Sequence, residues 1–299
     1  MRISINVTDF SWPGGPTALA PALAEVVGAA DVAGVDTVWV GDHLLQADPT
    51  CTPDEPVLEA YTTLGYLAAR TEHVRIGTMV TGVTYRPPAL LVKAVTTLDV
   101  LSGGRAWLGL GAGYREDEAY AMGLTLPPAV ERVERLEETL RLAQQMWAGD
   151  TGAFDGRHFT LDYPVCSPQP VQRPRPAVLV GGVGDGPMLR LAAQYADACN
   201  FFDVPDSGLT LRRELDVLAD HCAAAGRPFW EVEKTVTARM EPGEPAESVA
   251  ERCESFAEFG IEHVVFVAVG PWSVEAVEAV GEAVPVVAQI KPNSEVGVW

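Results

Sequence analysis

One apolar run, Thr37–Val40, ends in two residues that can hold or transfer a proton, Asp42 and His43. Because an imidazole titrates near neutral pH, His43 is a candidate for proton transfer. The competing interpretation is a structural histidine, with Asp42 capping the next segment or orienting the ring. The position directly after a strand-like run favours function, so we take the two residues as the candidate catalytic pair.

Two glycine-rich segments each join an apolar run to the start of a helical pattern. The first, LGLGAGYREDE, contains Gly109, Gly111 and Gly113, and the second, VLVGGVGDG, contains Gly181 and Gly182. Glycines before a helix let backbone N–H groups approach a phosphate. The spacing is not the dinucleotide fingerprint of a Rossmann fold. Tight packing could explain either segment alone, whereas the two together favour a cofactor that carries a phosphate.

A third segment, RIGTMVTGVTYRPP, offers threonine hydroxyls, among them Thr81, and the cation Arg86. An ordinary structured loop is the alternative interpretation. The histidines lack the spacing that zinc sites favour, and the nucleophile motif GxSxG is missing. We therefore expect no metal site and no serine hydrolase.

The elements that must position these residues are eight apolar runs that alternate with amphipathic helical patterns. The predicted strands are Ile3–Val7, Thr37–Val40, Val74–Val80, Ala106–Leu110, Ala177–Val180, Ala198–Phe202, Val232–Thr237 and His263–Ala268. Strict alternation implies parallel strands with right-handed crossovers. Eight units predict an α/β fold, a closed (β/α)8 TIM barrel, with a doubly wound sheet as the alternative. In such a barrel the active site lies in the loops that follow the strands.

One long region interrupts the alternation. The pattern of Glu131–Trp147 predicts an amphipathic helix. Its polar side carries two i, i+4 pairs, Glu131 with Arg135 and Glu137 with Arg141. The next residues, about 148–175, predict an insertion before strand five with a hairpin around Asp155–Gly156. We expect a single barrel domain over residues 1–299.

The bulk composition limits the partners. The formal net charge is -20, from 41 acidic and 21 basic residues, and such a surface repels nucleic acids and anionic membranes. Five scattered cysteines argue against a disulfide framework. The first residues, MRISINVTDF, read as a strand, and no apolar run approaches the ~18 residues of a membrane span. We expect a cytoplasmic protein.

Taken together, these segments resemble the luciferase-like monooxygenase superfamily and, within it, the coenzyme F420-dependent oxidoreductases. The likeness lies in TVWVGDHLL, the stretch from YTTLGYLAARTEHVRIG to LGLGAGYREDE, RVERLEETLRLAQQMW, FDGRHFTL and PQPVQRPRPAVLVGGVGDG. It covers most of residues 1–240. It implies a barrel enzyme with a flavin-like cofactor, a small-molecule substrate and, as in many relatives, a homodimer.

The resemblance also implies roles for the matched positions. Asp42 and His43 would lie beside the cofactor ring. A bulge at Met79–Val80, often a non-proline cis peptide in relatives, would support the ring, with Thr81 next to it. Three residues of the glycine segment, Gly111, Ala112 and Gly113, would border the side chain of the cofactor. Gly181 and Gly182 would hold its phosphate through backbone N–H groups. Three positions depart from the family pattern: Tyr114, Asp185 and Ala47, which lies where some F420 enzymes carry an aromatic residue.

The implied reaction is hydride transfer between a substrate carbon and the deazaflavin of F420. His43 would transfer a proton, and Asp42 would orient His43. FMN in the same pocket, as in a monooxygenase, is the first alternative, and a flavin-binding barrel without turnover is the second. The residues do not identify the substrate.

Overall fold

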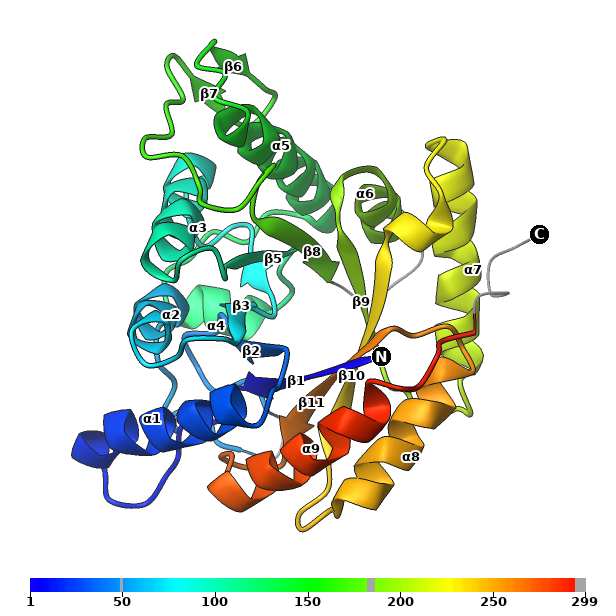
Figure 1. Cartoon of the computed structure of the whole chain (residues 1–299). Helices are drawn as coiled ribbons and strands as arrows, with labels where there is room; N and C mark the ends of the chain where they lie inside the picture. The colour runs from blue at the N-terminus through cyan, green and yellow to red at the C-terminus, as the bar shows by residue number, and fades with distance from the viewer. Residues whose placement is uncertain (49–50, 182–185, 294–299) are drawn as a thin grey trace.

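The barrel strands form one parallel sheet that closes on itself. A computed structural model describes residues 1–48, 51–181 and 186–293. Within them the strand order is β3-β2-β1-β11-β10-β9-β8-β5-β4. The two end strands, β3 (Arg75–Thr78) and β4 (Thr81–Gly82), are consecutive pieces of chain on either side of a cis peptide bond, Met79–Val80. A sheet that begins and ends with two parts of one strand is a barrel (Figure 1).

This closure confirms the predicted TIM barrel and rules out the doubly wound alternative. A bridge between Ile76 and Ala106 joins the two ends of the sheet. The other barrel strands are β1 (Arg2–Val7), β2 (Thr37–Val40), β5 (Trp107–Gly111), β8 (Ala177–Gly181), β9 (Ala198–Phe202), β10 (Glu233–Met240) and β11 (His263–Ala268). All eight predicted runs are present, and only the third is divided, at the cis bond.

The helices surround the strands, as Figure 1 shows. They are α1 (Pro16–Val32), α2 (Ala60–Ala68), α3 (Pro88–Leu101), α4 (Glu116–Ala121), α5 (Ala129–Trp147), α6 (Pro187–Tyr195), α7 (Leu209–Ala224), a 3-10 turn (Phe229–Glu231), α8 (Ala246–Ala257) and α9 (Val274–Val287). Their apolar faces pack on the outward-facing strand residues in one large core. Among the described residues, none of these helices is both long and apolar enough to cross a membrane.

The segment between α5 and β8 contains the predicted hairpin, formed by β6 (Phe154–Asp155) and β7 (Thr160–Leu161). Its loop is held by the Glu138 carboxylate of α5, which accepts backbone hydrogen bonds from residues 157–159. One helix pair differs from the prediction. Glu131 does pair with Arg135. Glu137 instead forms its ion pair with Arg190 of α6, 2.7 Å away, because the neighbouring helix brings a guanidinium into reach.

The inside of the barrel has its own small apolar cluster. It consists of Trp39, Trp107, Leu179, Ala198 and Val265, from five different strands. The rings of Trp39 and Trp107 lie 5.6 Å apart. Two such large side chains fit inside a barrel only if their neighbours are small. A Cβ on Gly77 would lie 2.7 Å from the Cβ of Trp107, which explains a glycine at that position.

Gly109 allows two barrel strands to approach closely. A Cβ at this position would lie 1.9 Å from the carbonyl oxygen of Thr78 on β3. Backbone cannot yield as a flexible side chain can, so the two strands would have to separate. This glycine of the LGLGAG segment is therefore explained by packing.

We predict that Gly109→Ala lowers the free energy of unfolding by more than about 2 kcal/mol because of this backbone clash. Urea denaturation measures the change. Gly65→Ala in α2 is the matched control, since a Cβ there meets nothing within 4 Å. The control should leave stability unchanged or raise it by up to about 1 kcal/mol. Equal stability of the two variants would refute the close strand contact.

Candidate functional site

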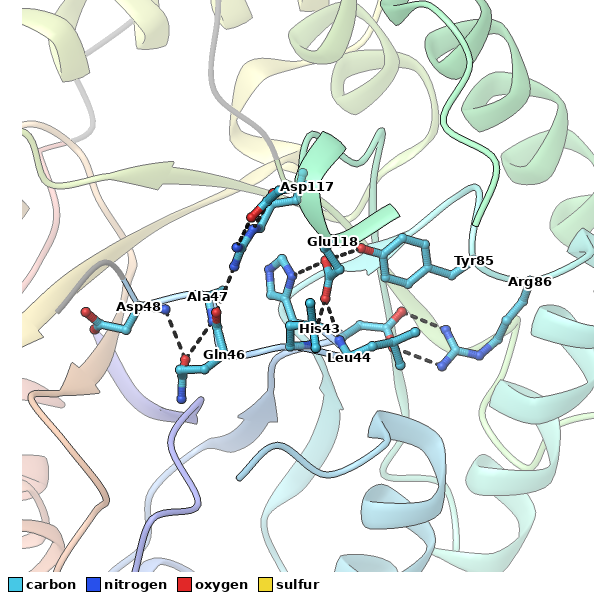
Figure 2. A network of polar contacts seen from close by, with 12 residues as sticks. His43, Leu44, Gln46, Ala47, Asp48, Tyr85, Arg86, Asp117 and Glu118 are labelled. Carbon is cyan, nitrogen blue, oxygen red and sulfur yellow. Dashed lines mark hydrogen bonds and ion pairs between the residues drawn. The ribbon is translucent and has the colours of Figure 1, made fainter. Parts of the chain in front are cut away.

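The site centres on Glu118, a buried carboxylate in α4. Its side chain is fully shielded from solvent. One carboxylate oxygen accepts a hydrogen bond from His43 Nδ1 at 2.9 Å and one from the Tyr85 hydroxyl at 2.5 Å. The other accepts the backbone N–H groups of Leu44 and Leu45 at 2.5 and 3.0 Å. Figure 2 shows Glu118 between His43 and Tyr85. One carboxylate thus ties together the segments that follow β2, β4 and β5.

These contacts decide the protonation of Glu118. Burial alone would raise its pKa, but the hydrogen bonds from His43, Tyr85 and the Leu45 amide outweigh burial and hold the pKa at about 2. Burial and the adjacent carboxylate raise the pKa of Tyr85, which therefore remains a hydrogen-bond donor. At neutral pH Glu118 is ionised and can only accept hydrogen bonds.

An acceptor-only partner fixes the tautomer of His43. Nδ1 must carry the proton that it shares with Glu118, so in the neutral ring Nε2 has a free lone pair. We assign the tautomer from this hydrogen bond. The ring is 27% exposed, and it meets Tyr114 edge-on with the ring centres 6.0 Å apart. His43 is thus held by one nitrogen and can exchange a proton with a ligand through the other.

Asp42 does not orient His43, contrary to the sequence-based expectation. Its carboxylate makes a bidentate contact with Arg86, at 2.6 and 2.9 Å, and Arg86 also pairs with Glu59 at 2.5 Å. Burial raises the pKa of Asp42, and the guanidinium opposes that rise. The guanidinium lies over the ring of Tyr61. Asp42 therefore fixes the loop after β4 to the loop after β2, and Glu118 holds the histidine.

Thr81 is part of the barrel wall. Its hydroxyl lies 2.8 Å from the Tyr61 hydroxyl and 2.7 Å from the Thr78 hydroxyl. The Thr78 hydroxyl in turn lies 3.1 Å from the carbonyl oxygen of Gly109. Thr81 is fully buried in this chain of hydrogen bonds. Because the hydroxyl is already bonded, only the backbone of Thr81 is available to contact a cofactor at the predicted position.

Two predicted cofactor residues, Gly111 of β5 and Gly181 of β8, lie against Val80. A Cβ on Gly111 would lie 2.6 Å from Val80 Cγ2, and a Cβ on Gly181 would lie 2.9 Å from Val80 Cγ1. The cis bond predicted at Met79–Val80 is present. Gly113 has a φ of 75°, a conformation that favours glycine. Packing of Val80 thus requires two of the glycines, and Gly182 lies outside the described residues.

Two buried polar atoms at the mouth are open to a ligand. Among the residues that the structure describes, Asn6 Oδ1 at the end of β1 and Thr84 Oγ1 after β4 have no hydrogen-bond partner. Such groups are rare unless another molecule supplies the partner. Thr84 lies beside Gly113, because a Cβ on that glycine would be 3.8 Å from Thr84 Oγ1. The mouth of the barrel therefore fits a polar group near the Gly111–Gly113 segment, as a flavin-like cofactor would present.

Glu118 and Tyr85 were not predicted from the sequence. Glu118 stands among Glu116 and Asp117 in the first turn of α4, where acidic residues commonly stabilise the positive end of the helix dipole. Because that explanation fits all three residues, it does not single out Glu118, which is the one that faces inward. The only signal in the sequence was its position two residues after Glu116, which can place it on the buried side of a short helix.

A second group of residues meets near the loop after β1. Asp9, Cys51 and Glu55 bring potential metal-ligand atoms within 4.8 Å of one another, although the sequence spacing suggested no metal site. Asp9 already accepts hydrogen bonds from the amide and hydroxyl of Ser11, at 2.7 and 2.6 Å. Its carboxylate thus shapes this loop.

The fold and the site define a (β/α)8-barrel protein with a carboxylate-held histidine at the C-terminal mouth. The chain belongs to the luciferase-like monooxygenase family, whose model matches residues 1–283. This confirms the family that the sequence resembles.

Relatives of the chain include proteins named as F420-dependent enzymes. The chain is 31% identical over 221 residues to the F420-dependent glucose-6-phosphate dehydrogenase of Kineococcus radiotolerans. The alignment covers 73% of this chain and 63% of the relative, so this chain spans less than two thirds of that protein. It is 27% identical over 296 residues to the enzyme of the same name from Amycolatopsis mediterranei, covering 92% and 85% of the two chains.

The fold also matches a solved structure. An F420-dependent secondary alcohol dehydrogenase in complex with an F420-acetone adduct aligns with a TM-score of 0.80. The alignment covers 96% of this chain and 98% of that chain at 19% identity. At this identity the likeness shows a shared fold.

The low pKa of Glu118 predicts a pH-dependent stability. Its pKa in the folded protein is about 2, below its ordinary value of 4.5. The stabilisation is therefore complete above pH about 4.5 and is lost as the pH falls towards about 2. We expect Glu118→Gln to lower the free energy of unfolding by about 2 kcal/mol at neutral pH. Urea denaturation across this pH range should show the difference from wild type shrinking.

The control for this experiment is Glu116→Gln, an exposed residue of the same helix. It should change stability by less than about 0.5 kcal/mol at any pH. A loss in Glu118→Gln that stayed constant down to pH about 2 would contradict the role of the ionised carboxylate.

Proposed function

We propose that this protein is an F420-dependent oxidoreductase that transfers a hydride between the deazaflavin and a small organic substrate. One observation carries the proposal: Glu118 fixes the tautomer of His43 and leaves Nε2 free at the mouth of the barrel. The similarity to F420-dependent relatives supports the choice of cofactor. The shared fold with an F420-dependent alcohol dehydrogenase is consistent with it.

The residues around Val80 suit this cofactor. The Met79–Val80 bulge would support the ring, and backbone groups of Gly111, Ala112 and Gly113 would border its side chain. The buried Thr84 hydroxyl has no partner in the described part of the chain and is free to bond to a polar group of that side chain. When bound, F420 supplies the ring carbon that accepts or donates the hydride.

His43 would handle the proton that accompanies the hydride. In the oxidation of an alcohol, Nε2 accepts the hydroxyl proton of the substrate, and in the reduction of a carbonyl it returns that proton. Glu118 holds the ring in the competent tautomer and stabilises the imidazolium that forms. Asp42 acts indirectly, since its pair with Arg86 secures the loop that carries His43.

The cofactor assignment is tested by titrating the purified protein with F420 and with FMN. We expect micromolar or tighter binding of F420 and clearly weaker binding of FMN. The absorption spectrum and mass of any co-purified cofactor provide a second measurement. Preferential binding of FMN would point to the monooxygenase alternative, and binding of neither cofactor would overturn the proposal.

The role of His43 predicts a selective loss of turnover. We expect His43→Ala to lower kcat by about 100-fold or more while F420 still binds, because the proton then lacks an acceptor. Glu118→Gln should also lower kcat, because its amide would donate to Nδ1 and place the proton on Nε2. Stopped-flow measurement of deazaflavin reduction across a pH series distinguishes these effects from lost binding.

Glu116→Gln serves as the control for the change in charge on α4 and should keep wild-type kinetics. If His43→Ala turned over at the wild-type rate with bound cofactor, the proton-transfer role would be refuted.

A further inference from the structure

The barrel wall opposite Val80 is formed by β10 and β11, with β9 and β1 on either side. In the closed sheet, β10 and β11 are the strands farthest from β4 and β5. Side chains alternate between the two faces of a strand, so every second residue points into the barrel. The β10 residues Val236, Ala238 and Met240 belong to the outer core. Thr237 and Arg239 therefore point inward.

Apolar side chains on this wall face the mouth of the barrel. Phe201 of β9 belongs to the outer core, so Phe202 points inward. Val265 of β11 belongs to the inner cluster, and the same alternation turns Val267 and Val269 inward. Val265 is fully buried, whereas Phe202 is 42% exposed and Val269 is 44% exposed. Solvent reaches an inward side chain only through the open end of the barrel, so Phe202 and Val269 line the mouth.

Asn6 offers an open hydrogen-bonding position on the same wall. Its neighbours on both sides belong to the outer core, so its side chain points into the barrel. The residue is 4% exposed, and its Oδ1 has no partner in the part of the chain that the structure describes. Asn200 differs, since its Oδ1 accepts two threonine hydroxyls of β10 at 2.8 and 3.1 Å. Asn6 pairs in register with Trp39 of β2, four residues before His43, and thus lies on the side of the mouth where His43 stands.

This wall presents little positive charge. The loops that follow its strands, residues 203–208, 241–245, 269–273 and 8–15, contain no lysine or arginine. They do contain carboxylates, such as Asp203 and Glu241. Arg239 points inward at the end of β10, but its Nη2 pairs with Asp48 at 2.7 Å. An anionic substrate would therefore meet carboxylates that repel it and a guanidinium that is already paired.

We propose that this wall selects an uncharged alcohol or ketone and packs the apolar part of that substrate against Phe202 and Val269. Sites for such ligands are lined by apolar side chains with a few placed polar groups. The Asn6 carboxamide carries both an acceptor and donors, so it can bond the oxygen of an alcohol or of a ketone. The inference rests on the proposed function, because the substrate must reach His43.

The reaction of such a substrate is balanced with the groups already described. The alcohol loses its hydroxyl proton to His43 Nε2 and a hydride from the carbon that bears the hydroxyl. The hydride passes to the deazaflavin, and a ketone remains. In the reverse direction the ketone receives the hydride from reduced F420 and the proton from His43.

The first test measures kcat/KM of the F420-loaded protein for 2-propanol, 2-butanol, 2-pentanol and 2-hexanol. The matching ketones are measured with reduced F420. We expect kcat/KM to rise about two- to fourfold with each added methylene group, because each one is buried against the apolar wall. The anion 5-hydroxyhexanoate has the carbon chain of 2-hexanol with a carboxylate at the far end. Its kcat/KM should be at least about 10-fold lower than that of 2-hexanol.

The second test removes the aromatic ring of the wall. We expect Phe202→Ala to lower kcat/KM for 2-hexanol about 10-fold or more and for 2-propanol less than about threefold, since only the longer chain reaches the ring. Trp230→Ala is the matched control. Trp230 is 73% exposed in the 3-10 turn that precedes β10, away from the mouth. This variant should keep wild-type kinetics, and both variants should bind F420 as wild type does.

The third test removes the polar group of Asn6 and keeps a side chain of similar size. We expect Asn6→Leu to lower kcat/KM about 10-fold for every alcohol, with the dependence on chain length unchanged. Its dissociation constant for F420, measured by titration of deazaflavin fluorescence, should equal that of wild type. A variant that instead lost F420 affinity would show that Asn6 contacts the cofactor, and its role in substrate binding would be wrong.

Four further results would overturn the proposal. They are a kcat/KM that does not change with chain length, a preference for 5-hydroxyhexanoate over 2-hexanol, an equal loss for all alcohols in Phe202→Ala, and no reaction with any of the alcohols or ketones. In each case binding of F420 by the wild-type protein leaves the proposed function intact. If the wild-type protein did not bind F420, the proposed function itself would fail, and the assignment of this wall with it.

Discussion

The buried Glu118 carboxylate is the interaction on which the arrangement of the mouth depends. A charge removed from water is tolerated only when several donors surround it. Here two side chains and two backbone N–H groups do so, and they come from the loops after β2 and β4, while the carboxylate comes from α4 after β5. Three loops that are free to vary in a barrel are thereby held in one arrangement. The same contacts set the tautomer of His43. The hydrogen bonds to Glu118 therefore fix both the arrangement of the loops and the position of the proton on His43.

A second constraint acts in the barrel wall. Val80 occupies the space that side chains on Gly111 and Gly181 would fill, and Gly109 admits the backbone of Thr78. These glycines suggested a cofactor phosphate in the sequence, and the structure gives each of them a packing reason as well. The two explanations are compatible, because the small residues that admit Val80 also leave backbone near the mouth without side chains over it.

Ion pairs hold several arginines around the mouth. Arg86, Arg115 and Arg239 are each paired with a carboxylate of the chain, and they stiffen loops. Sequence alone gives every arginine the same charge, whereas a guanidinium that is already paired with a carboxylate contributes less attraction to an anionic ligand.

The sequence by itself determined the fold and pointed to a candidate site at the strand ends. Hydrophobic periodicity is a local property, so the eight strands, α5 and the β6–β7 hairpin could be read from the chain, and strand ends indicated His43. The family resemblance supplied the cis bond at Met79–Val80. The partners of individual side chains could not be predicted from the sequence. Glu118 rather than Asp42 holds His43, and Arg190 rather than Arg141 pairs with Glu137. Each depends on residues far apart in the chain that meet only when the barrel closes, and only the tertiary structure decides which of several carboxylates faces inward.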